Sequence, residues 1–522
     1  MSAAPTHPQA GSKGGSGKTG TTPAGAKAPA RAPLKLTNPV APEPAKLGRV
    51  LSVASECAPL IKTGGLADVV GALPAAMAAQ NWQLRTLIPA YRGLIKRLES
   101  PIELWSDPDL YGGPARVLSG KAAGIELLLL DAPHLYDRPG SLYIDEFGAD
   151  WPDNPRRFAA LSWAAAEIAS HGLKDGWKPD LIHAHDWQAG FAPLWTRGVT
   201  PSIMTVHNIA FQGIAQARQI DELRLPYNEF HPDGYEFWGQ ISALKAGLVY
   251  AHAITTVSPT YAAELTRPEF GFGLDGVIRR RADALSGILN GVDTAVWNPA
   301  RDPVIAANYD PANMAGKAAC AAALREEFRL DAEGGPLFIV VSRLTRQKGL
   351  DLLLENLPGL ISRGGQLAVL GTGEPDLQEG FLRAASHHPG RIGVHIGYDE
   401  ALSHRMFAGG DVVLVPSRFE PCGLTQMYGL AYGTLPLVAH TGGLADTVID
   451  ANDAAIRAGV ATGAQFSPVT SDALSLALRQ VSALYAQPAI WQRMTFRAMT
   501  HPVGWDASAR DYAALYDRLT RN

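Results

Sequence analysis

The chain has 522 residues, of which 46% are hydrophobic and 18% charged, as is typical of a globular protein with large apolar cores. This length predicts two or three domains, and the formal net charge of −4 argues against a surface built mainly to bind nucleic acid. The three cysteines lie far apart, and no apolar stretch reaches the ~18–20 residues of a membrane helix. We therefore expect a cytoplasmic protein without disulfide bonds or a membrane partner.

Residues 1–46 consist mainly of Ala, Pro, Gly, Ser, Thr and Lys. Such a segment cannot bury enough apolar surface to offset the entropy of ordering it, so the sequence predicts a disordered tail. Residues 13–19 (KGGSGKT) resemble a phosphate-binding P-loop, but Ser12 replaces its first glycine. No strand is expected before this motif and no helix after it, so we interpret it as part of the tail.

A series of apolar strands that alternate with helices begins at Arg49. The expected strands are 49–55, 84–89, 125–131, 180–185, 202–206 and 253–258, and the expected helices include 66–80 and 156–171. Near-continuous apolar strands of this kind are typical of parallel sheets with helices on both faces. A Pro-containing loop then breaks the series, and we expect a hinge near 292–310.

A second alternating series follows this loop. Its expected strands are 337–342, 366–370, 392–396, 411–415 and 435–439, and its expected helices are 348–362, 424–432 and 472–486. The two series predict an α/β protein with two doubly wound, Rossmann-like domains, residues 47–295 and 296–503, which face a central cleft and bind ligand at the carboxyl ends of their strands. A last helix at 506–520, within residues 504–522, could cross back to the first domain.

Six residues with the sequence TGGLAD occur twice, at 63–68 and 441–446. Each copy follows an apolar run and precedes a helix-like stretch. A strand, a two-glycine turn and a helix N-terminus present backbone N–H groups that can bind an anion. The repeat therefore predicts two pockets that face one shared, negatively charged ligand, and the alternative is a chance repeat of common residues.

Two short motifs resemble metal sites. His183 and His185 share one face of a strand and could ligate a metal, but no third ligand stands out, which favours a structural or sugar-facing role. Asp107 and Asp109 form a D-x-D motif in a Pro- and Gly-rich loop without an obvious strand, and we interpret it as a turn.

Two cations of the second domain follow an apolar strand. Arg343 lies at the end of this strand and Lys348 at the start of the next helix. A planar guanidinium fork and a mobile ammonium together suit a diphosphate. An ordinary solvated pair of loop charges is the alternative.

A second loop of this domain joins a carboxylate to a helix N-terminus. Glu420 precedes a helix whose N-terminal amides belong to Gly423, Leu424 and Thr425. The amides can hold a phosphate, while the carboxylate accepts hydrogen bonds from sugar hydroxyls. The loop therefore favours a ligand with both groups, and the alternative for Glu420 is a helix cap or surface acid.

Six motifs resemble, in the same order, those of the bacterial glycogen synthases and the related plastid starch synthases. They are residues 62–69 (KTGGLADV), 183–187 (HAHDW), 205–208 (TVHN), 290–293 (NGVD), 342–351 (SRLTRQKGLD) and 418–426 (RFEPCGLTQ). The resemblance runs from about Arg49 to the C-terminus. It implies the GT-B fold and retaining transfer of glucose from ADP-glucose to the non-reducing end of an α-1,4-glucan, without metal or cofactor. The sequence contains no signal for the oligomeric state.

The resemblance also implies roles for individual residues. Arg343 and Lys348 would neutralise the leaving ADP, Glu420 would grip the 3- and 4-hydroxyls of glucose, and His207 would contact its 6-hydroxyl. The remaining expected contacts are Lys62, Gly64 and Gly65 with the donor phosphates or glucose, Asp68, Tyr143 and Asn290 near the sugar, Tyr398 near the adenine, and Cys422, Gly423, Leu424 and Thr425 with the phosphates. Gln188, where close bacterial relatives often have His, lies at the acceptor edge.

Departure of ADP from an oxocarbenium-like sugar mainly requires stabilisation of negative charge, which two cations and helix amides can supply. Because no nucleophilic carboxylate stands out, we favour a front-face route in which the leaving phosphate helps to deprotonate the acceptor hydroxyl. Three alternatives are a transferase that uses UDP-glucose or builds a small glucoside, a nucleotide-dependent oxidoreductase, and a glucan-binding module without activity. The oxidoreductase would need a G-x-G-x-x-G turn, which residues 371–373 do not complete.

Overall fold

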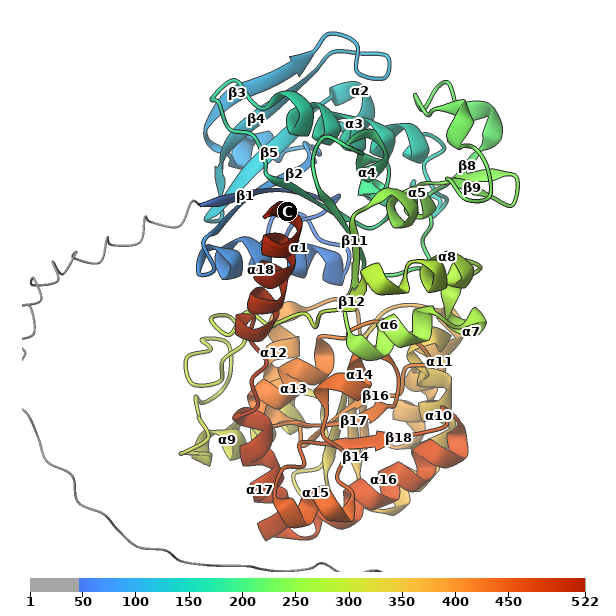
Figure 1. Ribbon diagram of the computed structural model, residues 1–522. Helices are drawn as coiled ribbons and strands as arrows, with labels where there is room; N and C mark the ends of the chain where they lie inside the picture. The colour runs from blue at the N-terminus through green and yellow to red at the C-terminus, as the bar shows by residue number, and fades with distance from the viewer. Residues whose placement is uncertain (1–46, 522) are drawn as a thin grey trace, which may run out of the picture. The chain divides into compact units, whose positions relative to one another are not determined.

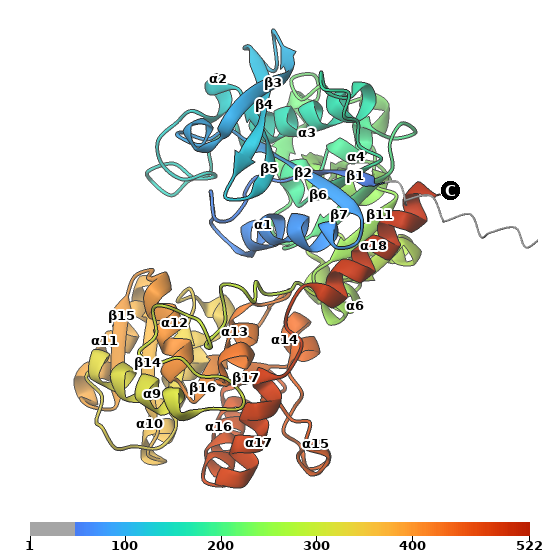
Figure 2. The ribbon, with the colours of Figure 1, turned by 90° about the vertical axis from the view of Figure 1, so that its left-hand side faces the viewer.

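The computed structural model describes residues 47–521 (Figures 1 and 2). The predicted tail, with its P-loop-like motif at 13–19, lies outside the described residues. The described part contains sheets of nine, six and three strands. Its two large sheets confirm the prediction of two doubly wound α/β domains, which we call the first and second domains. The boundaries at 295/296 and 503/504 stay predictions.

The first domain is built on the nine-stranded sheet. In spatial order this sheet contains β12 (Leu285–Gly287), β11 (Ala253–Thr256), β7 (Ser202–Val206), β6 (Leu181–His185), β1 (Gly48–Val53), β2 (Trp82–Pro89), β5 (Ile125–Asp131), β4 (Ala115–Ala122) and β3 (Glu99–Asp107). Strand β4 runs antiparallel to its neighbours β3 and β5, and the other neighbouring pairs are parallel. The chain builds outward from β1 in both directions, so the topological switch point, where ligands of such sheets bind, falls between β1 and β6.

The second domain is built on the six-stranded sheet, whose strands are all parallel. In spatial order it contains β15 (Ile392–Ile396), β14 (Gln366–Gly371), β13 (Leu337–Val341), β16 (Val412–Val415), β17 (Leu435–Ala439) and β18 (Ala464–Phe466). Its switch point falls between β13 and β16. The small third sheet contains β8 (Ile214–Gln216), β10 (Gln240–Ser242) and β9 (Glu236–Phe237).

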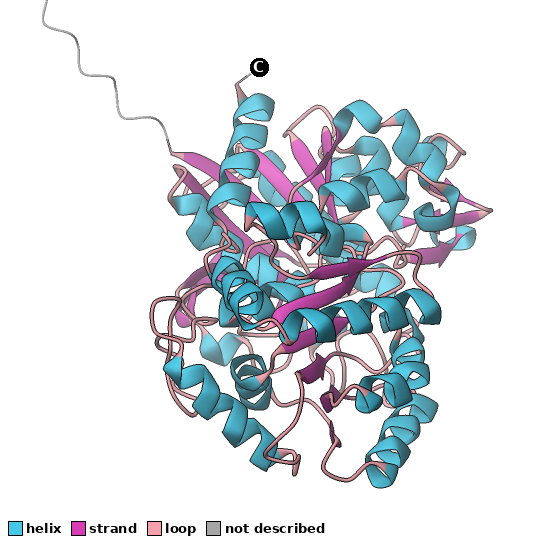
Figure 3. Ribbon diagram, turned by 90° about the horizontal axis from the view of Figure 1, so that it is seen from below, coloured by secondary structure: helices cyan, strands magenta, loops and turns pink. Residues whose placement is uncertain are grey.

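Helices pack against the strands of both large sheets (Figure 3). The longer ones are α1 (Gly65–Ala78), α3 (Asn154–His171), α5 (Ala243–Tyr250), α9 (Ala315–Glu327), α10 (Leu350–Ser362), α11 (Pro375–His387), α12 (Glu400–Gly409), α13 (Thr425–Tyr432), α16 (Ser471–Tyr485), α17 (Pro488–Met499) and α18 (Asp506–Thr520). The shorter ones are α2 (Pro133–Tyr136), α4 (Ala192–Trp195), α6 (Pro259–Leu265), α7 (Pro268–Gly271), α8 (Asp275–Arg280), α14 (Gly442–Thr447) and α15 (Asp453–Ala458). No helix among residues 47–521 is long and apolar enough to cross a membrane.

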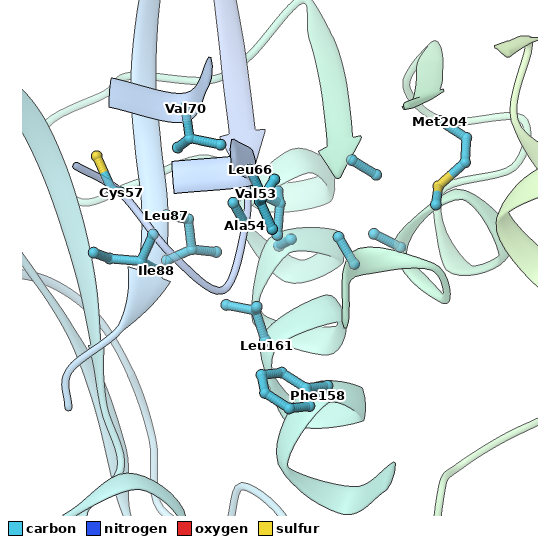
Figure 4. Close-up of a cluster of buried hydrophobic side chains, with 14 of the residues drawn as sticks. Val53, Ala54, Cys57, Leu66, Val70, Leu87, Ile88, Phe158, Leu161 and Met204 are labelled. Atoms are coloured by element: carbon cyan, nitrogen blue, oxygen red, sulfur yellow. The ribbon is translucent and has the colours of Figure 1, made fainter. Parts of the chain in front are cut away.

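Side-chain alternation along β1 divides the first domain into two apolar cores. Val50 packs with α1 and α18 on one face, whereas Leu51 and Val53 belong to the core that contains α3 on the other. Figure 4 shows part of the core that contains α3, with side chains from β1, α1, β2 and α3: Val53, Leu66, Val70, Leu87, Ile88, Phe158 and Leu161. A sheet covered on both faces explains why its strands are near-continuous apolar runs.

Several strands lie outside the expected ranges, and β3 and β4 are the longest of them. The antiparallel strands β3 and β4 extend the first sheet where no strand is expected. The expectation that Asp107 lies in a loop without a strand is therefore wrong, because this residue ends β3. The amide of Asp109 donates to Asp107 Oδ1 at 2.8 Å, so the D-x-D motif forms the turn that follows the strand.

The C-terminal helix α18 packs against α1 of the first domain (Figures 1 and 2). Tyr516 Oη lies 2.8 Å from His183 Nδ1, and the Tyr516 ring contacts Trp82 edge-on at 5.2 Å. The chain therefore passes between the domains twice. The two connecting segments are joined where the amide of Val292 donates to the carbonyl of Val503 at 2.8 Å.

Candidate active site

The loops at the two switch points carry most of the expected site residues. Residues 55–65 follow β1 in the first domain. In the second domain, residues 342–349 follow β13 and residues 416–424 follow β16. Because parallel strands end at the same edge of their sheet, each topology gathers these loops at one place.

A hollow in the second domain contains the Lys348–Glu420 ion pair. Lys348, Ser417, Glu420, Gly423 and Thr425 are among its lining residues. Lys348 Nζ lies 2.5 Å from Glu420 Oε2, and Ser417 Oγ donates to the same oxygen at 2.9 Å. The two charged side chains are only 17% and 10% exposed. A buried charge destabilises a protein unless it is paired. A ligand that binds Lys348 must therefore also form hydrogen bonds with Glu420.

The N-terminus of α13 forms one wall of this hollow. Gly423 has a φ of +71°, and a Cβ there would lie 2.5 Å from Gln426 Oε1, so only glycine fits without strain. The amides of Gly423, Leu424 and Thr425 precede the first internal hydrogen bonds of the helix and remain available to an anion. Burial raises the pKa of the Cys422 thiol to about 12, so this residue carries no charge at neutral pH.

Arg343 lies beside a different hollow. Its guanidinium has no hydrogen-bond or ion-pair partner among residues 47–521, and the side chain is exposed. The second hollow is also lined by Asn208 and Phe272 of the first domain and by Phe419 of the second. The structure therefore does not place the two expected diphosphate cations, Arg343 and Lys348, in one hollow.

The first TGGLAD turn holds a carboxylate of the protein itself. Thr63 Oγ1 donates to Glu56 Oε1 at 2.6 Å, and the amides of Thr63 and Gly64 donate to Glu56 Oε2. Tyr143 Oη donates to the same side chain at 2.5 Å, so it contacts the turn through Glu56. Glu56 is not among the residues expected from the sequence, although an acid shortly after the first strand is the signal that could have identified it.

The far side of this turn is open. A Cβ at Gly64 or Gly65 would meet no atom within 4 Å. Lys62 Nζ lies 2.7 Å from Asp68 Oδ1. Burial raises the pKa of Asp68, and the nearby charge of Glu400 adds to this effect although Lys62 opposes it. The electrostatic influence of Glu400 indicates that the loop before α12 lies near the first TGGLAD turn.

Tyr398 belongs to that loop. Its ring is 77% exposed, and its hydroxyl donates to Glu400 Oε2 at 2.8 Å. No other aromatic ring of residues 47–521 packs against it, so the ring face is free to stack on a planar group.

The second TGGLAD turn is not an open anion pocket. Glu264 of α6 accepts hydrogen bonds from Thr441 Oγ1 at 2.9 Å and from the amide of Gly442 at 3.0 Å. The amide of Gly443 donates to the Pro421 carbonyl at 3.0 Å. The prediction that both turns face one shared ligand is therefore wrong for this copy. In the first copy Glu56 likewise takes the amides of Thr63 and Gly64, and only the glycine face of that turn is open.

Three histidines form a buried row next to the end of β6. His183 is bonded to Tyr516 Oη and, at 2.5 Å, to Thr205 Oγ1. His185 Nδ1 lies 3.0 Å from His207 Nε2. These bonds occupy the ring nitrogens that a metal would need, and among residues 47–521 no group of three His, Cys, Asp or Glu side chains suits a metal ion. These bonds favour the structural role of the pair His183 and His185.

Two neighbours of this row complete the site. The amide of His207 donates to Asp186 Oδ1 at 2.7 Å, which fixes the backbone of the expected sugar-facing residue. Asn290 is buried, and its Oδ1 has no hydrogen-bond partner within residues 47–521. Buried polar atoms are normally paired, so this oxygen can accept a hydrogen bond from a ligand or a water.

The histidine row predicts a strong pH dependence of stability. Burial lowers the pKa values of His183 and His207 to about 3 and that of His185 well below its ordinary value, whereas burial raises the pKa of Asp186 to about 7. Near pH 5 the unfolded chain binds three protons on these histidines that the folded protein lacks, and the folded protein binds one on Asp186 that the unfolded chain lacks. Through these four groups unfolding takes up two protons, and their contribution to the free energy of unfolding falls by about 2.7 kcal/mol per pH unit as the pH falls.

Urea denaturation between pH 4.5 and 6 measures this slope. The variant His185→Gln is expected to reduce the slope by about one proton, which is about 1.4 kcal/mol per pH unit. Replacing the exposed His387 by Gln is the matched control and should leave the slope unchanged. Equal slopes for the protein and His185→Gln would show that His185 is protonated in the folded state.

Two family models cover most of the folded chain. Residues 49–280 match the starch synthase catalytic domain, and residues 325–493 match the family described as glycosyl transferases group 1. The glycogen synthase of Cereibacter sphaeroides is 59% identical over 476 residues, and that of Paracoccus denitrificans is 57% identical over 475. Each match covers 90% of this chain and at least 98% of the relative.

Solved structures agree with these matches. The catalytic domain of starch synthase IV from Arabidopsis thaliana, bound to ADP and acarbose, has a TM-score of 0.82 at 31% identity and covers 92% of this chain and 100% of that one. A sucrose-phosphate synthase from Thermosynechococcus elongatus, at 20% identity and a TM-score of 0.57, shares the fold. Two Rossmann-like domains with ligand loops at their switch points define a glycosyltransferase of the GT-B class. The chain belongs to the family of glycogen and starch synthases.

Proposed function

We propose that this chain transfers glucose from ADP-glucose to the non-reducing end of an α-1,4-glucan and so elongates glycogen in the cytoplasm, with retention at the anomeric carbon. The observation that carries the proposal is the Lys348–Glu420 pair beside the N-terminus of α13, because it combines a cation, helix amides and a hydroxyl acceptor in one hollow. The names of the relatives and the ADP in the Arabidopsis structure support this choice of donor and acceptor.

On the donor side, Lys348 exchanges Glu420 for a phosphate oxygen when ADP-glucose binds. The amides of Gly423, Leu424 and Thr425 hold the same diphosphate. Arg343 reaches it from the neighbouring hollow, since its guanidinium is exposed and unpaired among residues 47–521. Released from Lys348, Glu420 accepts hydrogen bonds from the glucose hydroxyls.

On the first-domain side, the open face of the TGGLAD turn receives the donor. Gly64 and Gly65 allow close approach, and Lys62 contacts the phosphates or the transferred glucose. His207 contacts the sugar, and Asp68 and Asn290 line its surroundings. The remaining expected residues act at the periphery: Tyr143 through Glu56, Tyr398 on the adenine, and Cys422 through its backbone.

The transfer follows a front-face route. The bond between the anomeric carbon and the phosphate oxygen breaks, the acceptor oxygen bonds to the same face of that carbon, and the acceptor proton moves to the departing phosphate. The negative charge that grows on the diphosphate is stabilised by Lys348, Arg343 and the α13 amides. We propose that two cations and helix amides replace a divalent metal in this role.

Incubation with glycogen and either ADP-glucose or UDP-glucose tests the function. We expect glucose to be incorporated from ADP-glucose, with full activity in EDTA and little incorporation when glycogen is omitted. Transfer from UDP-glucose alone would replace the proposed donor, and glucoside formation without a glucan would replace the acceptor. Loss of activity in EDTA that one added metal restores would contradict metal independence.

A further inference from the structure

Helix α6 of the first domain is hydrogen-bonded to the loop of the second domain that carries Glu420. Ser258 is the N-cap residue of α6, and its buried hydroxyl donates to the Pro421 carbonyl at 2.7 Å. The Tyr261 ring meets the Phe419 ring edge-on, with 5.4 Å between centroids. Helix α6 therefore contacts the residues on both sides of Glu420.

A second path leads from α6 to the same loop through the second TGGLAD turn. Glu264 holds Thr441 and Gly442, as described above. The amide of Gly443 then donates to the carbonyl of Glu420 at 3.2 Å. A Cβ on Gly442 would lie 1.9 Å from that carbonyl oxygen, so the turn and the loop are in direct backbone contact. A movement of the turn must therefore displace Glu420.

A third contact anchors α14, which begins within this turn, to α6 (Figure 1). Asp446 accepts hydrogen bonds from the amide and the hydroxyl of Thr260, both at 2.7 Å. The position of Glu264 nevertheless costs stability, because its second oxygen, Oε2, is buried and has no hydrogen-bond partner in the described part of the chain. An unpaired buried carboxylate oxygen costs stability, so stabilisation alone explains Glu264 poorly.

We propose that α6 sets the position of Glu420, with Ser258 and Glu264 as its positioning residues. This inference rests on the proposed role of Glu420 in holding the glucose of the donor. Because α6 belongs to the domain that carries His207, the contacts fix one sugar-binding group relative to the other across the two domains. A displacement of about 1 Å at a reacting centre can lower a rate about a hundredfold.

Steady-state and ADP-binding measurements on Glu264→Ala test the proposal. We expect kcat to fall about 10- to 100-fold, and the dissociation constant for ADP to rise by a smaller factor, because Lys348 and Arg343 follow β13 and only the amides of Gly423 and Leu424 belong to the displaced loop. Glu264→Gln keeps an acceptor oxygen and should restore most of kcat. The control is Thr266→Ala, since this hydroxyl donates only within its own helix turn, to the Ala263 carbonyl, and kcat should not change.

Hydrogen exchange provides a measurement that does not depend on catalysis. The amides of Arg418 and Gly443, which donate to the carbonyls of Gln347 and Glu420, should exchange about tenfold faster in Glu264→Ala than in the unchanged protein, and at the original rate in Glu264→Gln. Thr441→Val removes the other half of the contact with little change of shape, and serves if Glu264→Ala does not fold; exchange of the same two amides should rise in this variant. Unchanged exchange in both variants, or unchanged kcat with faster exchange, would overturn the proposal. Faster exchange in a protein that does not transfer glucose would instead support the link and refute the proposed function.

Discussion

Replacing Glu420 by Gln is expected to slow glucosyl transfer about a hundred- to a thousandfold, while ADP binds at least as tightly as before. A carboxamide accepts hydrogen bonds from sugar hydroxyls more weakly than a carboxylate, and the loss of a contact of this kind costs about 3–4 kcal/mol in the transition state. The effect on ADP has a different cause, because Lys348 Nζ loses the charged partner that lies 2.5 Å away. Calorimetric dissociation constants for ADP and single-turnover rates measure the two effects separately.

Lys348→Ala should impair ADP binding as well as glucosyl transfer. It removes the proposed phosphate contact and leaves Glu420 buried without its ion-pair partner, so both ADP affinity and the single-turnover rate should fall. Arg346→Ala is the matched control, because Arg346 lies in the same loop but pairs with Asp376 at 2.6 Å outside the hollow. If Glu420→Gln weakened ADP binding and Lys348→Ala did not, the two proposed roles would be reversed.

Tyr516→Ala should destabilise the protein by about 3–5 kcal/mol, the cost of truncating a large buried ring. The ring is fully buried on α18, packs against Trp82 and is bonded to His183. Tyr516→Phe keeps the ring but leaves the histidine nitrogen without that partner, so a smaller loss of about 1–3 kcal/mol is expected. Urea denaturation at pH 7 measures the free energy of unfolding of each variant.

The control for this series is Asp511→Ala on the exposed face of α18, which should change the free energy of unfolding by less than about 0.5 kcal/mol. A Tyr516→Ala variant as stable as this control would show that α18 contributes little to the core of the first domain.

The sequence predicted buried strands well and exposed ones poorly, for a physical reason. Strands β7 and β17 begin and end where the apolar runs do, because both faces of these strands are covered. Strand β3 has only Leu104 buried and contains a proline, so neither an apolar run nor a clean alternation marks it. Its place depends on pairing with β4, which local sequence does not contain.

The two TGGLAD copies show that local sequence does not determine the contacts of the site residues either. Asp68 pairs with Lys62, six residues away, whereas Asp446 pairs with Thr260, 186 residues away. Identical hexapeptides thus have different partners, and only the tertiary fold determines which carboxylate reaches each turn. Chemistry and resemblance placed Lys348 and Glu420 at one ligand, but their direct ion pair depends on the neighbouring ends of β13 and β16.

The placement of α18 has a consequence for biosynthesis. Strands β1, β6 and β7 are translated before the second domain, yet the face that contains Val50, Leu181 and Ile203 is covered by α18, which is translated after it. The nascent chain must therefore carry an apolar sheet surface throughout synthesis of the second domain, which is the situation in which chaperones bind. The domain that is made first is therefore completed only after the second domain has been made.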